Sequence, residues 1–271
     1  MNKHLPGAPS PLLLLAGAAL CLWAPGTAHA GASLRIWPID PVIEADRSSG
    51  ALWLENPGDA PALIQVRLFG WTQAQGEDVY DGQPAVVASP PVVSIPPKAR
   101  QLVRLSNMLG VRPAGESAFR IVIDEIPVDP TSPGAADARS PATPPREAHA
   151  IKFQMRYSIP LFVYGGQPRR NGGGGAPASA AGATLRCALV ERAGRTFVQI
   201  RNSGPSHARL VDVHFAPPGR AAPLAEGLLG YVLAGSSMAW PLPAGVTGRE
   251  PLSLSGPTRG ARIVLPECTD G

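Results

Sequence analysis

Few side chains in this 271-residue sequence have the types and spacing that enzyme chemistry requires. Beyond the first thirty residues the histidines are His149, His207 and His214, and no Gly-x-Ser-x-Gly sequence supplies a serine nucleophile. Nucleophilic catalysis needs a nucleophile, a base and an orienting group close together. The sequence therefore predicts a protein that is not an enzyme, with His207 and His214 at a surface or at the edge of a core.

Motifs for metals, cofactors and nucleic acids are equally sparse. Cys187 and Cys268 lack the short paired spacing of a zinc site. The glycine run at 172–175 neither follows a strand nor opens a helix, as a phosphate-binding loop would. The formal net charge is +4, and the basic residues occur singly rather than in a stripe with aromatic residues. We expect no metal, no cofactor, no nucleic acid and no small-molecule substrate.

The first thirty residues have the organisation of a secretory signal peptide. Lys3 precedes the apolar run Leu12–Trp23, and Ala28-His29-Ala30 offers the small-x-small pattern that a signal peptidase accepts. No later stretch approaches the roughly 20 uninterrupted apolar residues of a membrane helix. We therefore expect cleavage after Ala30 and a soluble, exported mature protein.

Cleavage would leave Cys187 and Cys268 as one pair of cysteines. Disulfides persist in the compartments that exported proteins reach, so a bridge between the two is expected. The alternative is a pair of buried thiols.

From Ser33 onward, short extended runs alternate with turn signals, and almost no helical periodicity is found. Ile64, Val66 and Leu68 alternate with other residues, which is the period of a strand with one buried face. Strands spaced by roughly 8 to 12 residues with Pro and Gly turns indicate an all-β sandwich. The expected strands are Leu34–Trp37, Val42–Ile43, Ala51–Glu55, Ile64–Phe69, Ala85–Ala88, Val92–Ile95, Gln101–Leu105, Ala118–Ile126 and Ile151–Val163, followed by a weaker series at Thr184–Leu189, Arg195–Arg201, Ala208–Phe215, Ser237–Leu242 and Arg259–Leu265.

Two segments without apolar periodicity divide the chain. Pro127–Ala150 reads as a long loop, and the Gly/Ala/Ser-rich stretch after Gly165 has too little apolar surface to offset its ordering entropy. The expected organisation is a signal peptide at 1–30, an N-terminal β-domain at 31–165, a glycine-rich linker at 166–182 and a C-terminal β-sandwich domain at 183–271.

The segment Ile151–Val163 is the longest apolar-rich extended run. Its apolar residues occupy alternate positions: Ile151, Phe153, Met155, Tyr157, Ile159 and Leu161. The loop before it and the glycines after it favour a place at a sheet edge. Long apolar edge strands are normally avoided because they recruit other chains, so this one suggests pairing with a partner strand. The alternative is an ordinary core strand.

Several sequence fragments occur in a specific order and spacing. They are Ala51-Leu52-Trp53-Leu54-Glu55-Asn56, Ser89-Pro90-Pro91, Ile95–Leu105, Asp124-Glu125-Ile126-Pro127 and Ile159-Pro160-Leu161-Phe162-Val163. Together they resemble the PapD-like family of periplasmic pilus chaperones, which serve the chaperone–usher pathway. The form Phe69-Gly70-Trp71-Thr72-Gln73 resembles the non-classical, archaic-like branch of this family.

The resemblance implies two immunoglobulin-like β-sandwich domains in a PapD-like arrangement, in the periplasm. Such a chaperone lends its G1 strand to a pilin subunit that lacks its own last strand, and then delivers the subunit to an outer-membrane usher. Aligning the end of G1 puts Ile151, Phe153 and Met155 at the donated positions, with Tyr157 next on the same strand face. The implied partners are therefore pilin subunits and an usher.

The sequence departs from the family pattern at the site that binds the subunit's C-terminal carboxylate. Classical members use an Arg on the first strand and a Lys on G1, but here the aligned residues are Asp40 or Ile43, and Pro160. None of these can donate a charge-assisted hydrogen bond to a carboxylate. Arg156 is a candidate replacement, and its alternative role is a solvated strand charge. Glu116 matches an acidic residue of an internal ion pair between domains, although its partner is not evident.

A second functional class is a structural or adhesive secreted β-sandwich protein such as a pilus subunit. Subunits carry an N-terminal donor extension and lack their final strand. Here strand sequence begins at Leu34, soon after the cleavage site, and the first domain keeps a terminal strand. The chaperone is therefore favoured.

Overall fold

The computed structural model describes residues 34–108, 115–127, 154–165, 184–215, 223–255 and 262–270. The chain divides into two compact units, Met1–Gly31 and Ala32–Gly271, and all described residues belong to the second. Their regular secondary structure consists only of β-strands, which confirms the predicted all-β class. No helix in these ranges is long and apolar enough to cross a membrane. The expected signal peptide and the linker at 166–182 lie outside the described residues.

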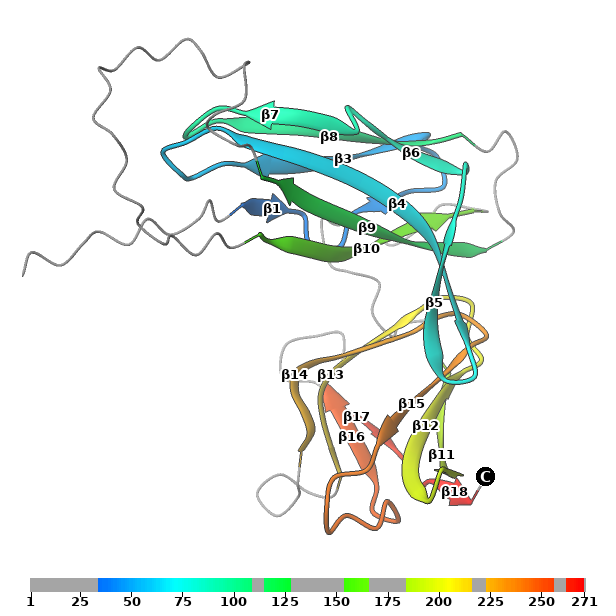
Figure 1. The fold of residues 1–271 in the computed structure, drawn as a ribbon. Helices are drawn as coiled ribbons and strands as arrows, with labels where there is room; N and C mark the ends of the chain where they lie inside the picture. Colours follow the sequence, from blue (N-terminus) through cyan, green and yellow to red (C-terminus); the bar gives the residue numbers. More distant parts are fainter. Residues whose placement is uncertain are drawn as a thin grey trace, which may run out of the picture. The chain divides into compact units, whose positions relative to one another are not determined.

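Strands β1 to β10 form the first sandwich (Figure 1). One sheet has the order β1-β3-β8-β6, and the other has the order β2-β10-β9-β4-β5 with β7 beside β4. The strands are β1 (Arg35–Trp37), β2 (Val42–Ile43), β3 (Ser49–Glu55), β4 (Ala62–Ala74), β5 (Glu77–Gly82), β6 (Val86–Ser89), β7 (Val92–Ile95), β8 (Arg100–Asn107), β9 (Glu116–Ile126) and β10 (Arg156–Tyr164).

The core of the first sandwich follows from alternation along these strands. Leu52 and Leu54 on β3 and Ile121 and Ile123 on β9 are fully buried, whereas their chain neighbours face outward. The first two strands belong to different sheets, because β1 pairs with β3 and β2 pairs with β10. The chain therefore passes from one sheet to the other between β1 and β2. This crossing closes the sandwich along one side.

Strands β11 to β18 form the second sandwich. Its sheets have the orders β15-β12-β11-β18 and β14-β13-β16-β17. The strands are β11 (Leu185–Arg192), β12 (Arg195–Asn202), β13 (Ala208–Phe215), β14 (Pro223–Val232), β15 (Ser237–Pro241), β16 (Leu252–Ser255), β17 (Arg262–Leu265) and β18 (Thr269–Asp270). Cys187 on β11 and Cys268, just before β18, form a disulfide.

An asparagine at the end of β3 organises the turn that follows in the first sandwich. The Asn56 side chain is fully buried and donates to the carbonyls of Ala60, at 2.8 Å, and Ile95, at 3.0 Å. Its Oδ1 accepts from the Gly58 N–H at 3.0 Å. The single amide thus satisfies three backbone groups, of which the Ile95 carbonyl is buried.

The second sandwich repeats this arrangement at the end of β12. Asn202 is fully buried, donates to the carbonyls of Ser206, at 2.7 Å, and Val232, at 3.1 Å, and accepts from the Gly204 N–H at 2.9 Å. The spacing from asparagine to each local partner is the same as at Asn56. The two sandwiches therefore share this asparagine-stabilised turn as well as a fold class.

The sequence did not predict the long hairpin β4–β5 in full, since only Ile64–Phe69 was expected as a strand (Figure 1). Its two-residue turn, Gln75-Gly76, has positive φ at both positions, which suits a tight hairpin turn. The Gly76 carbonyl accepts a hydrogen bond of 3.2 Å from the Ala239 N–H on β15. The hairpin tip thereby contacts the edge strand of the second sandwich.

Candidate functional site

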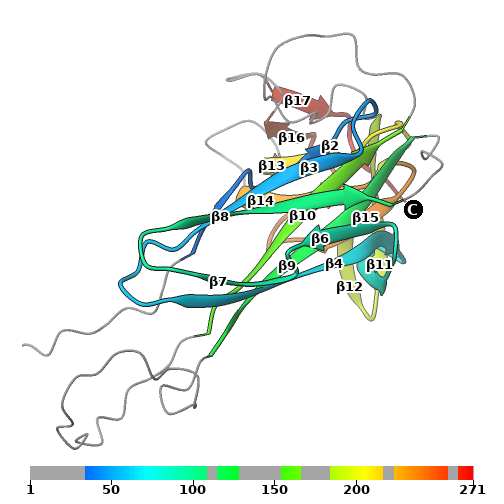
Figure 2. The ribbon, with the colours of Figure 1, turned by 90° about the horizontal axis from the view of Figure 1, so that it is seen from above.

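The edge of β10 is the part of the molecule that the sequence singled out. The expected strand Ile151–Val163 begins later in the structure, at Arg156, and ends at Tyr164. β9 pairs with the whole length of β10, beside which it lies in Figure 2, whereas β2 pairs only with Phe162 and Val163. From Arg156 to Leu161, no strand among the described residues pairs with the other edge of β10.

The backbone of this edge has a definite pattern of donors and acceptors. Met155 accepts from Glu125 N–H on the β9 side, and the Phe162 N–H donates to Pro41 on the opposite side. Along a strand the backbone N–H and C=O groups of successive residues are directed toward opposite neighbouring strands. The backbone groups of even-numbered residues of β10 are therefore directed away from β9. Arg156 and Ser158, which are exposed, thus each offer an N–H and a C=O at the open edge. Pro160 is buried and has no N–H to offer.

The side chains at odd-numbered positions form a row that becomes more exposed toward the start of β10. Leu161 and Val163 are buried in the core of the first sandwich. Tyr157 and Ile159 are partly buried and pack against this core, and Met155 is 43% exposed. The first sandwich therefore buries the end of this apolar row but leaves its start, at Met155, partly exposed to solvent.

The four predicted subunit-binding residues are Ile151, Phe153, Met155 and Tyr157. Ile151 and Phe153 lie outside the described residues. Met155 and Tyr157 lie on one strand face, the face that closes the core.

Arg156 lies on the opposite face of β10 and is held by a buried carboxylate. Its Nε donates to Asp124 Oδ1 at 2.5 Å, and Arg67 donates to the other carboxylate oxygen at 2.6 Å. Burial on its own raises the pKa of Asp124, but the hydrogen bonds from Arg156 and Arg67 outweigh it and lower this pKa below its usual value. The Arg156 side chain is nevertheless 67% exposed, so it is fixed in direction but accessible to solvent.

Pro160, at the position where classical members carry the anchoring lysine, lies directly across from Arg120 on β9. The Arg120 guanidinium lies 3.8 Å from the centroid of the Trp71 ring and donates to the Tyr80 hydroxyl at 3.2 Å. Trp71 in turn donates to Asp78 at 2.8 Å. Sequence reasoning missed Arg120 because a single arginine on a strand carries no motif.

Glu116 has a partner that the sequence did not reveal. His207 Nδ1 lies 2.8 Å from Glu116 Oε2, and the His207 backbone N–H donates to Oε1 at 2.8 Å. Of the two positions predicted for His207, the surface is wrong, because only 3% of this residue is exposed. Its ring stacks on Phe162 of β10 with centroids 3.6 Å apart. The contact joins residues far apart in the chain, which explains why sequence reasoning missed it.

An aromatic cluster surrounds Phe162. Its buried members are Trp71, Phe162, Tyr231 and Leu233. The Gln73 side-chain amide forms two hydrogen bonds to the main chain beside the cluster. Its Nε2 donates to the Tyr231 carbonyl and its Oε1 accepts from the Leu233 N–H, both at 2.9 Å. The two ends of β10 therefore differ, because one is enclosed by this cluster and the other is open.

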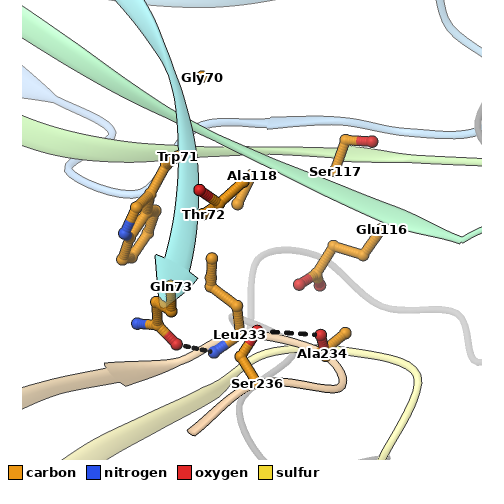
Figure 3. A pocket seen from close by; sticks show the side chains of 10 residues that line it. All are labelled: Gly70, Trp71, Thr72, Gln73, Glu116, Ser117, Ala118, Leu233, Ala234 and Ser236. Atoms are coloured by element: carbon orange, nitrogen blue, oxygen red, sulfur yellow. Dashed lines mark hydrogen bonds between the residues drawn. The ribbon is translucent and has the colours of Figure 1, made fainter. Parts of the chain in front are cut away.

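Beside the cluster lies a cavity of about 370 Å³ (Figure 3). Gln73 and Leu233, joined by a hydrogen bond, line one part of it, and Glu116 lines another. The carboxylate of Glu116 is already bonded to His207, so the cavity offers no unpaired charge for a ligand. In the part of the chain that the structure describes, no group of three or more His, Cys, Asp or Glu could hold a metal ion.

Comparisons with known proteins agree with this geometry. Residues 38–167 match the family described as "Pili and flagellar-assembly chaperone, PapD N-terminal domain". The structure is similar to one from the complex of the chaperone CsuC with the tip adhesion subunit CsuE, from the archaic chaperone–usher Csu pili of Acinetobacter baumannii. The identity is 28%, the match covers 87% of this chain and 99% of that chain, and the TM-score is 0.63.

More distant solved structures share the fold. The CupB2 chaperone of Pseudomonas aeruginosa is 18% identical, covers 87% of this chain and 100% of its own, and has a TM-score of 0.52. The Escherichia coli chaperone DraB is 21% identical, with coverages of 87% and 97% and a TM-score of 0.52. No curated protein matched the sequence significantly.

Proposed function

Because the chain belongs to the PapD-like family of pilus chaperones, with the family's N-terminal domain at residues 38–167, we propose that it stabilises pilin subunits by donor-strand complementation. The family consists of chaperones and not of enzymes. The observation that carries the proposal is the open edge of β10, where an apolar row leaves the cover of its own sandwich. A subunit that lacks its last strand can pair with this edge and receive those side chains in its own core.

The chemistry of the open edge supports this role. Arg156 and Ser158 offer main-chain donors and acceptors to a partner strand, as strand addition requires. Met155 is 43% exposed, so its burial in a partner would contribute roughly half of the about 1.5–3 kcal/mol expected for a fully exposed side chain, before ordering costs. Ile151 and Phe153 continue the same alternation in the sequence, so we assign them to the donated row as well.

The carboxylate of the subunit's C-terminus requires a cationic partner. Arg156 is our candidate, because Asp124 fixes its direction while most of the side chain stays exposed. A guanidinium has five N–H donors, so bonding to Asp124 leaves others for a second carboxylate.

We further propose a periplasmic location and an outer-membrane usher as the second partner. The signal-peptide pattern at residues 1–30 supports export. The likeness to CsuC and the form Phe69-Gly70-Trp71-Thr72-Gln73 support the archaic-like branch. We keep the domain limits 31–165 and 183–271 as part of this proposal, since they enclose the two groups of sheets.

The competing function, a pilus subunit, is less consistent with the fold. A subunit lacks the last strand of its sandwich and cannot close its own core. Here β10 is present and contributes Leu161 and Val163 to the core of the first sandwich. This domain is therefore suited to give a strand rather than to receive one.

Co-expression with a pilin subunit from the same genome tests the proposal. We expect the double substitution Phe153→Asp and Met155→Asp to abolish recovery of a soluble one-to-one complex. Leu102→Asp, at an exposed apolar position on β8, is the control and should leave recovery unchanged. Unchanged recovery with the double variant, at unchanged thermal stability, would show that β10 is not the donor strand.

A further inference from the structure

The outer face of the sheet formed by β11, β12 and β15 carries an unusual set of charges. Inward-facing positions on these strands include Cys187, Val198 and Ile200, which are buried in the core of the second sandwich. Side chains alternate along a strand, so the residues between them face outward. The outward residues on β11 and β12 include four arginines, namely Arg186, Arg192, Arg195 and Arg201, which we call the arginine face.

The four arginines oppose one another in pairs. Arg186 lies directly across from Arg201, and Arg192 lies directly across from Arg195. Directly opposite side chains have Cβ atoms about 4.5–5.5 Å apart, and like charges in such positions are destabilising. Among the described residues, no carboxylate forms an ion pair with any of the four. The repulsion is therefore not relieved within the described part of the molecule.

Between the two arginine pairs the face is largely apolar. Val190 lies across from Phe197, and Ala188 lies across from Gln199. Arg192 also lies over the Phe197 ring, 5.7 Å from its centroid. Along β11 the two pairs are six residues apart, which corresponds to roughly 20 Å of extended strand. The face thus has cationic ends and an apolar middle.

The tip of the β4–β5 hairpin partly covers this face beside its middle, at Ala239 on β15, which lies across from Gln199. The end at Arg186 and Arg201 is open. The tip of the β4–β5 hairpin lies against Arg192, since a Cβ added at Gly76 would come within 2.7 Å of the arginine Nη2. Arg186, Arg195 and Arg201 are exposed. The pair of Arg186 and Arg201 is therefore the more accessible one.

We propose that the arginine face docks an acidic segment of a protein partner, with carboxylates at its ends and apolar side chains between them. Arginine binds carboxylates through paired N–H donors, and a partner's acidic groups would relieve the repulsion between facing arginines. The apolar row between the pairs favours a polypeptide over a surface of phosphate groups. This site goes beyond the proposed function, because it lies on the second sandwich and does not require strand donation by β10.

A synthetic peptide of the sequence Glu-Glu-Val-Phe-Val-Glu-Glu with a fluorescent label is a suitable probe. We expect its fluorescence anisotropy to report binding to the full mature chain, weakened at least tenfold by Arg186→Glu combined with Arg201→Glu. Arg249→Glu is the matched control: it lies in the same sandwich outside β11 and β12, its side chain is 77% exposed, and its effect should stay within twofold. Binding should also weaken as salt concentration rises.

Two results would overturn the proposal. One is equal affinity of the peptide for the native chain and the double variant. The other is binding of phosphatidylglycerol vesicles, lost in the double variant, without binding of the peptide, because this would assign the face to a lipid surface. The double substitution Phe153→Asp and Met155→Asp, which should abolish recovery of the subunit complex, should leave peptide binding unchanged, so a failure of the proposed function remains distinguishable from a failure of the arginine face.

Discussion

The last strands of the two sandwiches, β10 and β18, are secured in opposite ways. β10 is nine residues long and has a complete partner on one side only, since β2 reaches just its final part. β18 is two residues long and pairs in parallel with β11, and the neighbouring Cys268 is bonded covalently to Cys187 of that strand. One sandwich therefore ends in a long strand with an open edge, and the other in a short strand closed by a covalent bond.

This difference is informative because the sandwiches are otherwise built alike. Each has a buried asparagine, Asn56 or Asn202, that bonds the carbonyl four residues later and the N–H two residues later. The sandwiches share the asparagine-stabilised turn but differ in their terminal strands. This difference indicates that the open edge of β10 is a specialised feature of the first sandwich and not a general property of the fold. Four predictions test this interpretation.

Removing the covalent closure should have the largest effect. Replacing both Cys187 and Cys268 by serine opens a loop with a sequence separation of 81 residues. We expect this to destabilise the second sandwich by about 3–4 kcal/mol. Urea unfolding followed by hydrogen exchange and mass spectrometry would locate the loss. If hydrogen-exchange protection fell equally in β3 and β9 of the first sandwich, the disulfide would stabilise both sandwiches and not the second one alone.

Replacing Asn56 or Asn202 should destabilise its own sandwich by a similar amount if the two turns are stabilised in the same way. Asn202→Ala leaves three buried backbone groups without partners, so we expect a loss of about 2–3 kcal/mol. Asn56→Ala should cost a similar amount in the first sandwich. The same exchange measurement would compare them, and a large effect at only one of the two would break the parallel between the sandwiches.

The open end of β10 should depend on Asp124. In Asp124→Asn the charge that holds Arg67 and Arg156 is lost, and we expect a loss of about 1–2 kcal/mol at neutral pH. The folded-state pKa of Asp124 lies below its unfolded value, so its stabilisation is present above the unfolded pKa and disappears as pH falls through the folded pKa.

Unfolding by urea at several pH values provides the measurement for this carboxylate. The stability difference between the native chain and Asp124→Asn should be constant near pH 7 and should shrink below about pH 4. A difference that does not change with pH would mean that the charge of Asp124 contributes nothing.

The smallest effect is expected at the hairpin tip. Gly76 has a positive φ of 79°, and an added Cβ would approach Arg192 closely. We expect Gly76→Ala to cost about 1 kcal/mol and to increase hydrogen exchange at Ala239, its hydrogen-bond donor on β15. Gly82→Ala is the control, because the space around Gly82 is open and its φ is ordinary. Equal effects of the two substitutions would argue against the contact at the tip.

The fold class could be predicted because alternation and turn residues are local signals. Most strands of the first sandwich lie within a few residues of their predicted places, and Val42–Ile43 and Val92–Ile95 match in full. β5 was missed because its sequence, Glu77–Gly82, is acidic and largely exposed, without an apolar face. β14 was missed because Gly227 and Gly230 interrupt its pattern and a register shift separates its pairings with β13.

The candidate site was predictable in part for the same reason. The alternation of Met155 and Tyr157 is visible in the sequence, and so is the missing lysine at Pro160. The bond between Glu116 and His207 could not be predicted, because it joins distant positions and neither residue belongs to a local pattern. Arg120 is another example, since its stacking on Trp71 arises only when β9 and β4 lie side by side.

The position of Phe162 on β10 has a thermodynamic consequence. Its ring stacks on His207 and contacts Tyr231, while the next residue, Val163, lies in the core of the first sandwich. A partner that binds the open end of β10 more tightly when this stack is formed must stabilise the stack by the same free energy, because such coupling is reciprocal. Occupancy of the edge and order around His207 would then rise and fall together, which makes the protection of His207 a remote indicator of whether the chaperone is loaded.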